Sequence, residues 1–517
     1  MQKPLDDSLD KIARGAGIAV VGMMLGVLFV FVTRLIIARY GLQSSYGTFS
    51  LAVVILQVAM LLSGLGLHRG ATRYIAHFRG GDDKASIRAT MFSSLRFSIF
   101  ASIIVGLVVY FSADYVSINF FNAPDLAPAM KIFAFGVPFT NLTRMLISFF
   151  QGYDRVAPGV FFQNIVLNAI TLIILIIIVT AGFSFNTVFY AYLIAIVVTS
   201  IIIAVYTTKR LPERITLTDI RRSPPVTREL LMFSLPLLGS SIVTMLMINV
   251  DTLMLGYYKT MDMVGLYNAA HPLATFISIP LTALILIYTP VATGLFSRNK
   301  MTELRRNYIV LTKWLVSLTL PVFLVVALFP EATVRLFFGQ EYIGAAAALR
   351  ILSIGFIFNN LLGPNAETLI AKGHPRFILW ATVSTAAMNI VLNMLLIPPM
   401  GMEGAAIGSA ISLTSINAVR SLWLYRLSGI QPFSKNLLKP LAISVVLALL
   451  IQLISSTFLT VTFWMIPIIF VIFCVIYLLA VLFSRSFDKE DIALLQLIEK
   501  RSGINTTPLK KLLGRFR

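Results

Sequence analysis

Several ionisable side chains lie within or near long apolar stretches of the sequence, and six of them have types that indicate binding chemistry. They are Arg34, Arg144, Asp251, His271, Glu367 and Arg420. If these stretches cross a membrane, each ionised group costs about 2.5–3.5 kcal/mol on insertion scales, so it is retained where it lines water, pairs or binds a ligand. We therefore treat these six residues as candidate site residues.

The arginines are candidates for binding an anion, because a guanidinium group offers a planar fork that matches two phosphate oxygens. Arg144 has several apolar residues on both sides, and we predict that it faces a cavity; packing within its own bundle is the alternative. Arg420 lies nearer the end of its apolar stretch. Extension of its side chain to the membrane surface is therefore an equally good interpretation.

Glu367 and His271 are the candidate sites for a coupling ion, H⁺ or Na⁺. Glu367 follows Pro364, and a proline-broken helix frees carbonyl groups that are tolerated beside a cavity. A cap or an ion pair with Lys372 is the alternative for this carboxylate. His271 precedes Pro272 and could carry a proton, although a lone histidine beside a helix-kinking proline is more often a packing residue.

The sequence carries no pattern for a metal, a cofactor or a nucleotide. The single cysteine, Cys474, lies in an apolar run, and the four histidines lack ligand-like spacing. No Gly-x-x-x-x-Gly-Lys-Ser/Thr segment occurs. We therefore expect no metal site and no cofactor.

The composition predicts that these residues are positioned by membrane helices. The 517 residues are 58% hydrophobic and 12% charged, against about 25% charged in ordinary globular domains. Too few charges remain to cover a soluble surface, so much of the exterior must face lipid. We predict an all-α integral membrane protein with about fourteen transmembrane helices, at 15–38, 45–67, 88–112, 129–150, 158–181, 185–207, 229–257, 264–290, 308–329, 345–371, 377–397, 403–425, 437–458 and 462–484.

The distribution of basic residues predicts the orientation. Most Lys and Arg residues outside the apolar runs fall on the side of the N-terminus, whereas the opposite loops carry only Arg39, Lys131, Lys259 and Arg335. The positive-inside rule therefore places both termini in the cytoplasm, in a multi-pass protein of the cytoplasmic membrane. This topology accounts for the net charge of +20, so we expect no nucleic-acid partner.

Short similarities in the same order indicate an internal duplication. Segments 34–40 and 46–52 resemble 251–257 and 264–270, and the pentapeptide Asn-Ile-Val-Leu-Asn occurs at 164–168 and at 389–393. Two six-helix repeats entering from the same side would be related by an axis along the membrane normal, with substrate between them near the midplane. Arg34 and Asp251 then occupy equivalent positions, as an outward gate, as partners of a substrate phosphate, or as a structural ion pair.

The repeat predicts four parts of the chain. Residues 1–218 would form an N-lobe of helices one to six, and residues 219–428 a C-lobe of helices seven to twelve. Residues 429–484 would form helices thirteen and fourteen. Residues 485–517 would be a basic cytoplasmic tail, either solvated or lying on anionic lipid.

Six short motifs follow one another along the chain, at Gly15–Gly17, Ile36–Gly41, Tyr46–Phe49, Gly64–Leu67, Arg73–Ala76 and Leu392–Gly408. In this order they resemble a known family, the polysaccharide and oligosaccharide flippases of the multidrug/oligosaccharidyl-lipid/polysaccharide (MOP) exporter superfamily. The resemblance runs through about residues 8–485. It implies a V-shaped pair of six-helix lobes that give alternating access to a central cavity. It also implies a cargo of polyprenyl-linked oligosaccharide, moved from the inner to the outer leaflet, with membrane lipids and glycan-assembly enzymes as partners.

Two other functions are alternatives to a flippase, a transporter with a different substrate and a membrane enzyme. A cation-coupled multidrug or metabolite exporter shares the fold, and its cavity should be acidic, with Asp251 and Glu367 dominating the surface. A membrane enzyme would need catalytic side chains on large outer loops, yet the longest outer loop offers little beyond Asp114 and Asp125. We therefore expect a transporter and not an enzyme.

Overall fold

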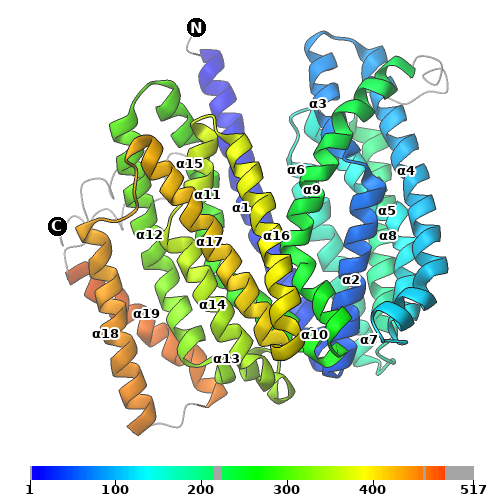
Figure 1. Ribbon diagram of the computed structural model, residues 1–517. Helices are drawn as coiled ribbons and strands as arrows, with labels where there is room; N and C mark the ends of the chain where they lie inside the picture. The colour runs from blue at the N-terminus through cyan, green and yellow to red at the C-terminus, as the bar shows by residue number, and fades with distance from the viewer. Residues whose placement is uncertain (1–2, 214–223, 458–461, 484–517) are drawn as a thin grey trace. The chain divides into compact units, whose positions relative to one another are not determined.

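The computed structural model describes residues 3–213, 224–457 and 462–483. Every regular element in this part of the chain is helical (Figure 1), as expected where no water satisfies the backbone and each segment must form its own hydrogen bonds. The predicted all-α membrane architecture is confirmed. The predicted basic tail, 485–517, lies outside the described residues.

Thirteen helices of the described part are long and apolar enough to cross a membrane. They match thirteen of the fourteen predicted spans. The remaining prediction, 403–425, coincides with helix α17 (Met402–Ser428), which is not among the thirteen. Serine, threonine, asparagine and two arginine residues lower its hydropathy, so α17 is a helix of the right length with a polar composition.

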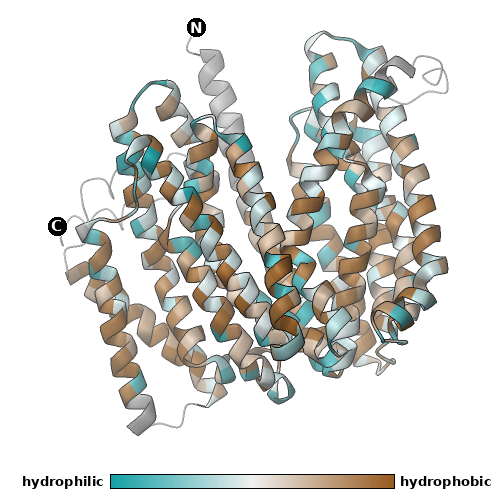
Figure 2. Ribbon diagram, viewed as in Figure 1, coloured by the Kyte–Doolittle hydropathy of each residue, from teal (hydrophilic) through white to brown (hydrophobic). Residues whose placement is uncertain are grey.

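The exteriors of the outer helices are suited to lipid. Figure 2 shows helices such as α4 and α18 hydrophobic along most of their length, with hydrophilic residues concentrated near their ends. Large apolar side chains are exposed on them, for example Phe111, which is 77% exposed, and Leu449, which is 66% exposed. Such continuous apolar surface would be unfavourable in water but is favourable against hydrocarbon.

The described helices fall into two compact units, Ile18–Gly265 and a second unit that starts at Leu266 and also takes in the beginning of the chain. The elements of the first are α1 (Lys3–Tyr40) from Ile18 onward, α2 (Gln43–Gly64), α3 (Leu67–Gly80), α4 (Lys84–Tyr115), η1 (Val116–Phe120), α5 (Leu126–Gly152), α6 (Ala157–Gly159), η2 (Val160–Val166), α7 (Leu167–Thr180), α8 (Thr187–Arg210), α9 (Pro224–Tyr258) and the start of α10 (Met261–Thr275).

In the first unit, α5 packs against α2, α3, α4 and α8, and α9 packs on α2, α3 and α4. The core between these helices buries aromatic rings, including Phe133, Phe149, Phe150 and Phe189. The contacts of α9, the seventh predicted span, therefore fall within this unit. The lobe boundaries at residues 218, 428 and 484 stay predictions.

The second unit contains the remaining helices, with α12 and α14 buried among their neighbours. Helix α17 packs against α14 and α16, while α18 and α19 pack on α12. Its elements are η4 (Phe276–Ser278), α11 (Ile279–Ser297), α12 (Met301–Leu328), α13 (Pro330–Phe337), η5 (Gln340–Ala345), α14 (Ala346–Leu361), α15 (Asn365–Ala371), α16 (Pro375–Met400), α17, α18 (Lys435–Thr457), η6 (Phe463–Met465) and α19 (Ile466–Phe483).

Two glycines allow the beginnings of α2 and α10 to meet closely in the first unit. A Cβ on Gly47 would lie 1.9 Å from the carbonyl oxygen of Met261, and a Cβ on Gly265 would lie 2.2 Å from that of Gln43. Both obstacles are backbone atoms, which cannot rotate away. Only glycine therefore fits this crossing.

We expect Gly47→Ala to destabilise the protein by about 1–3 kcal/mol, because the added methyl group forces two backbones apart. The measurement is thermal unfolding of the purified protein in detergent. Gly239→Ala is the matched control, since no atom lies within 4 Å of its added Cβ. Equal melting temperatures for the two variants would contradict the close crossing.

Candidate functional site

Helix α5, which carries Arg144, is joined to its neighbours by a buried hydrogen-bond network in the first unit. The Nδ2 atom of Asn141, one turn earlier on α5, donates to Ser63 Oγ at 2.6 Å and to Ser102 Oγ at 2.9 Å. These bonds connect α5 to α2 and α4, so they fix the rotation of α5 against its neighbours. Arg144 is half-buried and lies beside His68 and Arg69, close enough for electrostatic interaction.

The short helix α3 brings His68 and Arg69 to α5. The chain turns sharply after α2 because Leu65 and Gly66 both have left-handed backbones, with φ of 48° and 69°. A Cβ on Gly66 would lie 2.4 Å from the carbonyl oxygen of Ser234 on α9. This turn folds α3 back along α4, α5 and α9, with His68 and Arg69 in its first turn.

We define the resulting group of His68, Arg69 and Arg144 as the basic cluster. Neither guanidinium forms an ion pair within the part of the chain that the structure describes. Sequence reasoning treated His68 and Arg69 only as loop residues. The helical spacing of Arg69, Thr72 and Arg73 was the available signal for α3.

The pKa of the His68 imidazole depends on its burial and on the charges of the basic cluster. Burial, together with the positive charges of Arg144 and Arg69, lowers the pKa of His68 to about 4. At neutral pH its ring is therefore uncharged. The cluster therefore carries the charge of its two arginines beside a neutral imidazole.

The lowered pKa of His68 predicts acid sensitivity. Unfolded His68 binds a proton near pH 6.5, whereas folded His68 does so only near pH 4. Its contribution to stability is thus fully present above pH 6.5 and is lost as the pH falls towards 4. Thermal unfolding at pH 7.5 and pH 5 should show a larger acid-induced loss for the natural protein than for His68→Gln, and equal losses would contradict this.

Arg34 lies at the opposite end of α2 from the basic cluster. It is half-buried beside Tyr46 of α2 and Tyr192 of α8. Tyr46 is in the first turn of α2, whereas His68 follows its end, and at about 1.5 Å per helical residue this separates Arg34 from Arg144 by roughly 25–30 Å. The two arginines are therefore separate sites along the unit, and one pyrophosphate cannot bridge them.

Asp251 is nearly fully buried on α9, with 4% of its side chain surface exposed. Among the described residues, no ion pair joins it to Arg34. The structure therefore gives no direct salt bridge for the predicted Arg34–Asp251 pair. A role of either residue in gating or substrate binding stays a prediction.

Glu367 and Arg420 lie together in the second unit, beside a break between α14 and α15. The Nη2 atom of Arg420 donates to Thr382 Oγ1 at 2.9 Å, and Glu367 is close enough to interact with it electrostatically. The predicted helix break is present, with Gly363 at φ 69° directly before Pro364. No ion pair between Glu367 and Lys372 occurs in the described ranges.

Buried amide side chains surround this break. The Nδ2 atom of Asn365 donates to Asn417 Oδ1 at 3.3 Å and to Ser421 Oγ at 3.1 Å. The Nδ2 atom of Asn417 donates to Asn359 Oδ1 at 2.7 Å. A connected network of this kind holds the irregular backbone in one arrangement beside Glu367.

His271 packs among aromatic rings. Its ring centroid lies 6.0 Å from that of Tyr267 and 6.1 Å from that of Phe356. These contacts favour the packing interpretation of this histidine. A role in proton coupling stays a prediction.

Comparison with known families gives two matches along the chain. The model of the family described as "Polysaccharide biosynthesis protein" matches residues 12–298, which is more than half of the 517 residues. The model of the family described as "MatE" matches residues 236–395. Both basic sites of the first unit, at Arg34 and at the basic cluster, fall within the first match.

Curated relatives and a solved structure are also similar to the chain. It is 30% identical over 138 residues to the teichuronic acid biosynthesis protein TuaB of Bacillus subtilis (strain 168), which spans 26% of this chain and 28% of TuaB. It is 26% identical over 172 residues to the "Probable low-salt glycan biosynthesis flippase Agl15" of Haloferax volcanii, spanning 33% and 36% of the two chains. The chain thus covers about a third of these relatives' lengths.

The lipid II flippase MurJ, in an inward closed conformation, has the same fold. The TM-score is 0.66 at 15% sequence identity, and the match covers 89% of this chain and 97% of that one. At this identity the likeness concerns the fold alone.

Proposed function

The chain belongs to the polysaccharide biosynthesis protein family of the MOP exporter superfamily, and from this membership we propose that it flips a lipid-linked oligosaccharide across the cytoplasmic membrane. In this proposal the cargo is a polyprenyl phosphate or pyrophosphate glycan. It passes from the inner to the outer leaflet by alternating access. The cytoplasmic positions of both termini follow from the positive-inside rule and belong to the same proposal.

The basic cluster is the observation that carries this proposal. Arg69 and Arg144 lie near each other on α3 and α5, and neither is neutralised by a carboxylate among the described residues. Arg144 is half-buried and Arg69 is exposed beside it. Guanidinium groups without a counter-charge favour an anionic ligand, and their forked geometry suits phosphate oxygens. A lipid phosphate supplies that charge.

The names of the relatives support a glycan cargo. TuaB is named for teichuronic acid biosynthesis, and Agl15 for a glycan biosynthesis flippase. Both names describe glycan assembly, which requires the movement of sugar chains across a membrane. We propose the same class of cargo for this chain.

The proposal is tested by reconstituting the full chain into vesicles with a fluorescent polyprenyl-pyrophosphate oligosaccharide. A membrane-impermeant quencher then reports the fraction of headgroups in the outer leaflet. Protein-dependent exposure of inner-leaflet headgroups supports the proposal. Identical quenching with and without protein, when incorporation of the protein into the vesicles has been verified, would contradict the proposal.

A cation-coupled exporter of drugs or metabolites is the second candidate. The MatE match over residues 236–395 and the nearly buried Asp251 favour it. The test is uptake of an organic cation such as ethidium into the same vesicles under a pH or Na⁺ gradient. Gradient-driven cation transport that is lost in Asp251→Asn, without glycan-lipid movement, would select this function over the first.

A further inference from the structure

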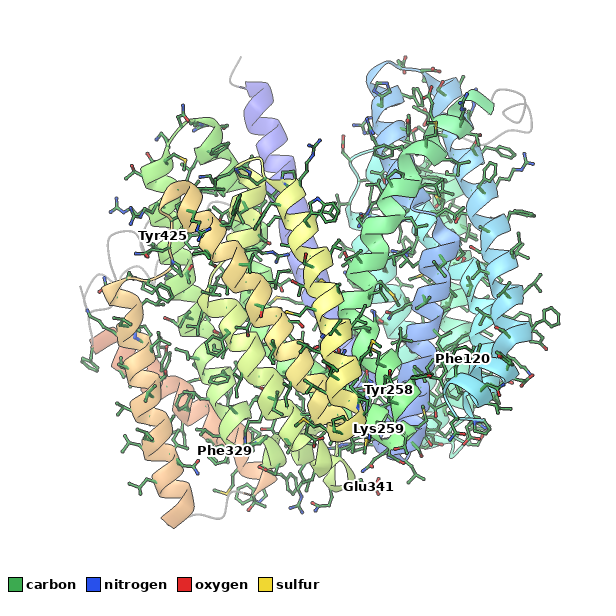
Figure 3. The ribbon with its side chains drawn as sticks, viewed as in Figure 1. Phe120, Tyr258, Lys259, Phe329, Glu341 and Tyr425 are labelled. Atoms are coloured by element: carbon green, nitrogen blue, oxygen red, sulfur yellow. The ribbon has the colours of Figure 1, made fainter. Side chains whose placement is uncertain are left out.

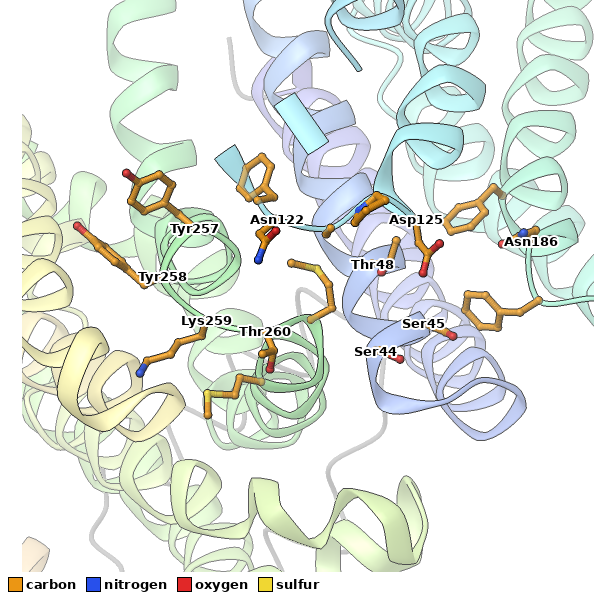
Figure 4. Close-up of a pocket in the computed structure, with 17 residues that line it drawn as sticks. Ser44, Ser45, Thr48, Asn122, Asp125, Asn186, Tyr257, Tyr258, Lys259 and Thr260 are labelled. Carbon is orange, nitrogen blue, oxygen red and sulfur yellow. The ribbon is translucent and has the colours of Figure 1, made fainter. Parts of the chain in front are cut away.

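A cavity of about 670 Å³ lies in the first unit, at the opposite end of α2 from the basic cluster. Figure 4 shows its labelled residues on the beginning of α2, the segment before α5, the beginning of α8 and the segment from α9 to α10. Figure 3 places Tyr258 and Lys259 at this end of α9. The volume falls within the range of about 300–1,000 Å³ that is usual for small-molecule sites.

Four polar side chains of this cavity belong to the starts of helices. Asp125 and Asn186 occupy the N-cap positions of α5 and α8, yet neither side chain caps its helix. Within the described ranges, Ser44 and Ser45 of α2 likewise form no side-chain hydrogen bond. Residues of these types at helix starts ordinarily satisfy backbone N–H groups. Here the four side chains can instead form hydrogen bonds with water or with a ligand in the cavity.

Aromatic rings supply the apolar surface of the same cavity. Tyr257 and Tyr258, at the end of α9, are 55% and 37% exposed and pack edge to face, with centroids 4.9 Å apart. Phe185, just before α8, and Phe189 of α8 line another side, with centroids 6.1 Å apart. The negative face of an aromatic ring attracts positively polarised C–H groups. A pyranose ring presents such C–H groups on its faces and hydroxyl groups around its rim.

The lining of the cavity contains one carboxylate and one ammonium group, those of Asp125 and Lys259, in contrast to the basic cluster at the other end of α2. Lys259 also interacts with another group of the protein. The exposed carboxylate of Asp125 disfavours an anion and accepts hydrogen bonds from hydroxyl groups. An uncharged ligand rich in hydroxyl groups fits this lining.

We propose that this cavity, named here the loop-end cleft and defined by Ser44, Asp125, Asn186, Tyr258 and Lys259, binds sugar residues of an uncharged saccharide. The inference rests on the proposed function and adds to it a second binding site for the cargo. The basic cluster holds the phosphate at one end of the unit. The loop-end cleft holds the sugars at the end whose loops carry few basic residues, which is the predicted outer side.

The test measures disaccharide binding to the purified full chain in detergent. The probes are maltose, lactose and N,N′-diacetylchitobiose, detected by saturation-transfer NMR, with inorganic pyrophosphate as the anionic competitor. At least one disaccharide should bind, and Asp125→Ala or Tyr258→Ala should weaken that binding about tenfold or more. Loss of a hydrogen bond to a charged group, or of a stacked ring, has effects of that size.

Two matched control variants remove a carboxylate and an aromatic ring that lie outside the loop-end cleft. Asp262→Ala and Tyr190→Ala delete an exposed carboxylate and an exposed ring near the same end of the unit. Each should leave disaccharide affinity within about twofold of the natural protein. The proposal is overturned if no disaccharide binds, if the controls weaken binding as much as the cleft variants, or if pyrophosphate displaces the sugar from the cleft.

This result is separable from that of the vesicle assay. Glycan-lipid movement without disaccharide binding would overturn the loop-end cleft and leave the proposed function standing. Disaccharide binding that depends on Asp125, without glycan-lipid movement, would support the cleft as a sugar site and overturn the flippase.

Discussion

Replacing Arg144 with alanine is expected to reduce glycan-lipid movement at least about 30-fold. The substitution removes a partly buried guanidinium from the basic cluster, and losing one partner of a buried charge contact costs about 2–5 kcal/mol. Arg144→Lys retains the positive charge but lacks the planar fork of the guanidinium group, so it should show an intermediate transport rate. The measurement is the initial rate in the quencher assay at equal protein incorporation.

Arg96→Ala is the control for this prediction. Arg96 also lies on an apolar helix of the first unit, α4, but its side chain is exposed at the helix surface. Its removal should change the rate by less than about twofold. A normal rate in Arg144→Ala would show that the basic cluster does not hold the cargo.

Asn141→Ala is expected to destabilise the protein by about 2–3 kcal/mol and to slow transport as well. Asn141 is 3% exposed and donates to two buried serine hydroxyls, so its loss leaves polar groups unsatisfied in the core. The rotation of α5 is then less well fixed, and Arg144 moves with it. Thermal unfolding and the transport rate measure the two effects.

Asn119→Ala provides the comparison for Asn141→Ala. Asn119 is exposed, and its side chain donates to the carbonyl oxygen of Tyr115, one turn earlier. Its replacement should alter stability by no more than about 0.5 kcal/mol. Equal stability losses in the two variants would mean that the Ser63–Asn141–Ser102 network does not fix α5.

The helical architecture could be predicted from the sequence because hydrophobic length is a local property. Apolar runs of about twenty residues must form helices in lipid, and the break at Pro364 follows from the missing N–H of proline. The polar helix α17 was also located, because the predicted run 403–425 coincides with it. These features depend on residues that are adjacent in the sequence, so the sequence alone predicts them.

The arrangement of the site could not be predicted in the same way. The grouping of His68 with Arg144 depends on the left-handed turn at Leu65 and Gly66, which folds a loop-like segment back onto α5. The separation of Arg34 from Arg144 depends on which ends of α1 and α5 lie along α2. Both are consequences of packing between distant segments, and one sequence does not contain them explicitly.

The most direct test of the phosphate-binding cluster is the pKa of His68 with and without inorganic pyrophosphate. Two-dimensional NMR of the protein labelled with ¹³C-histidine measures this pKa. The signal of His68 is assigned as the one that is missing from the spectrum of His68→Gln. The free protein should titrate near pH 4, and bound pyrophosphate should raise that value towards 6.5 by neutralising Arg69 and Arg144. A pKa that stays unchanged at saturating pyrophosphate, or that rises equally in Arg144→Ala, would contradict the account.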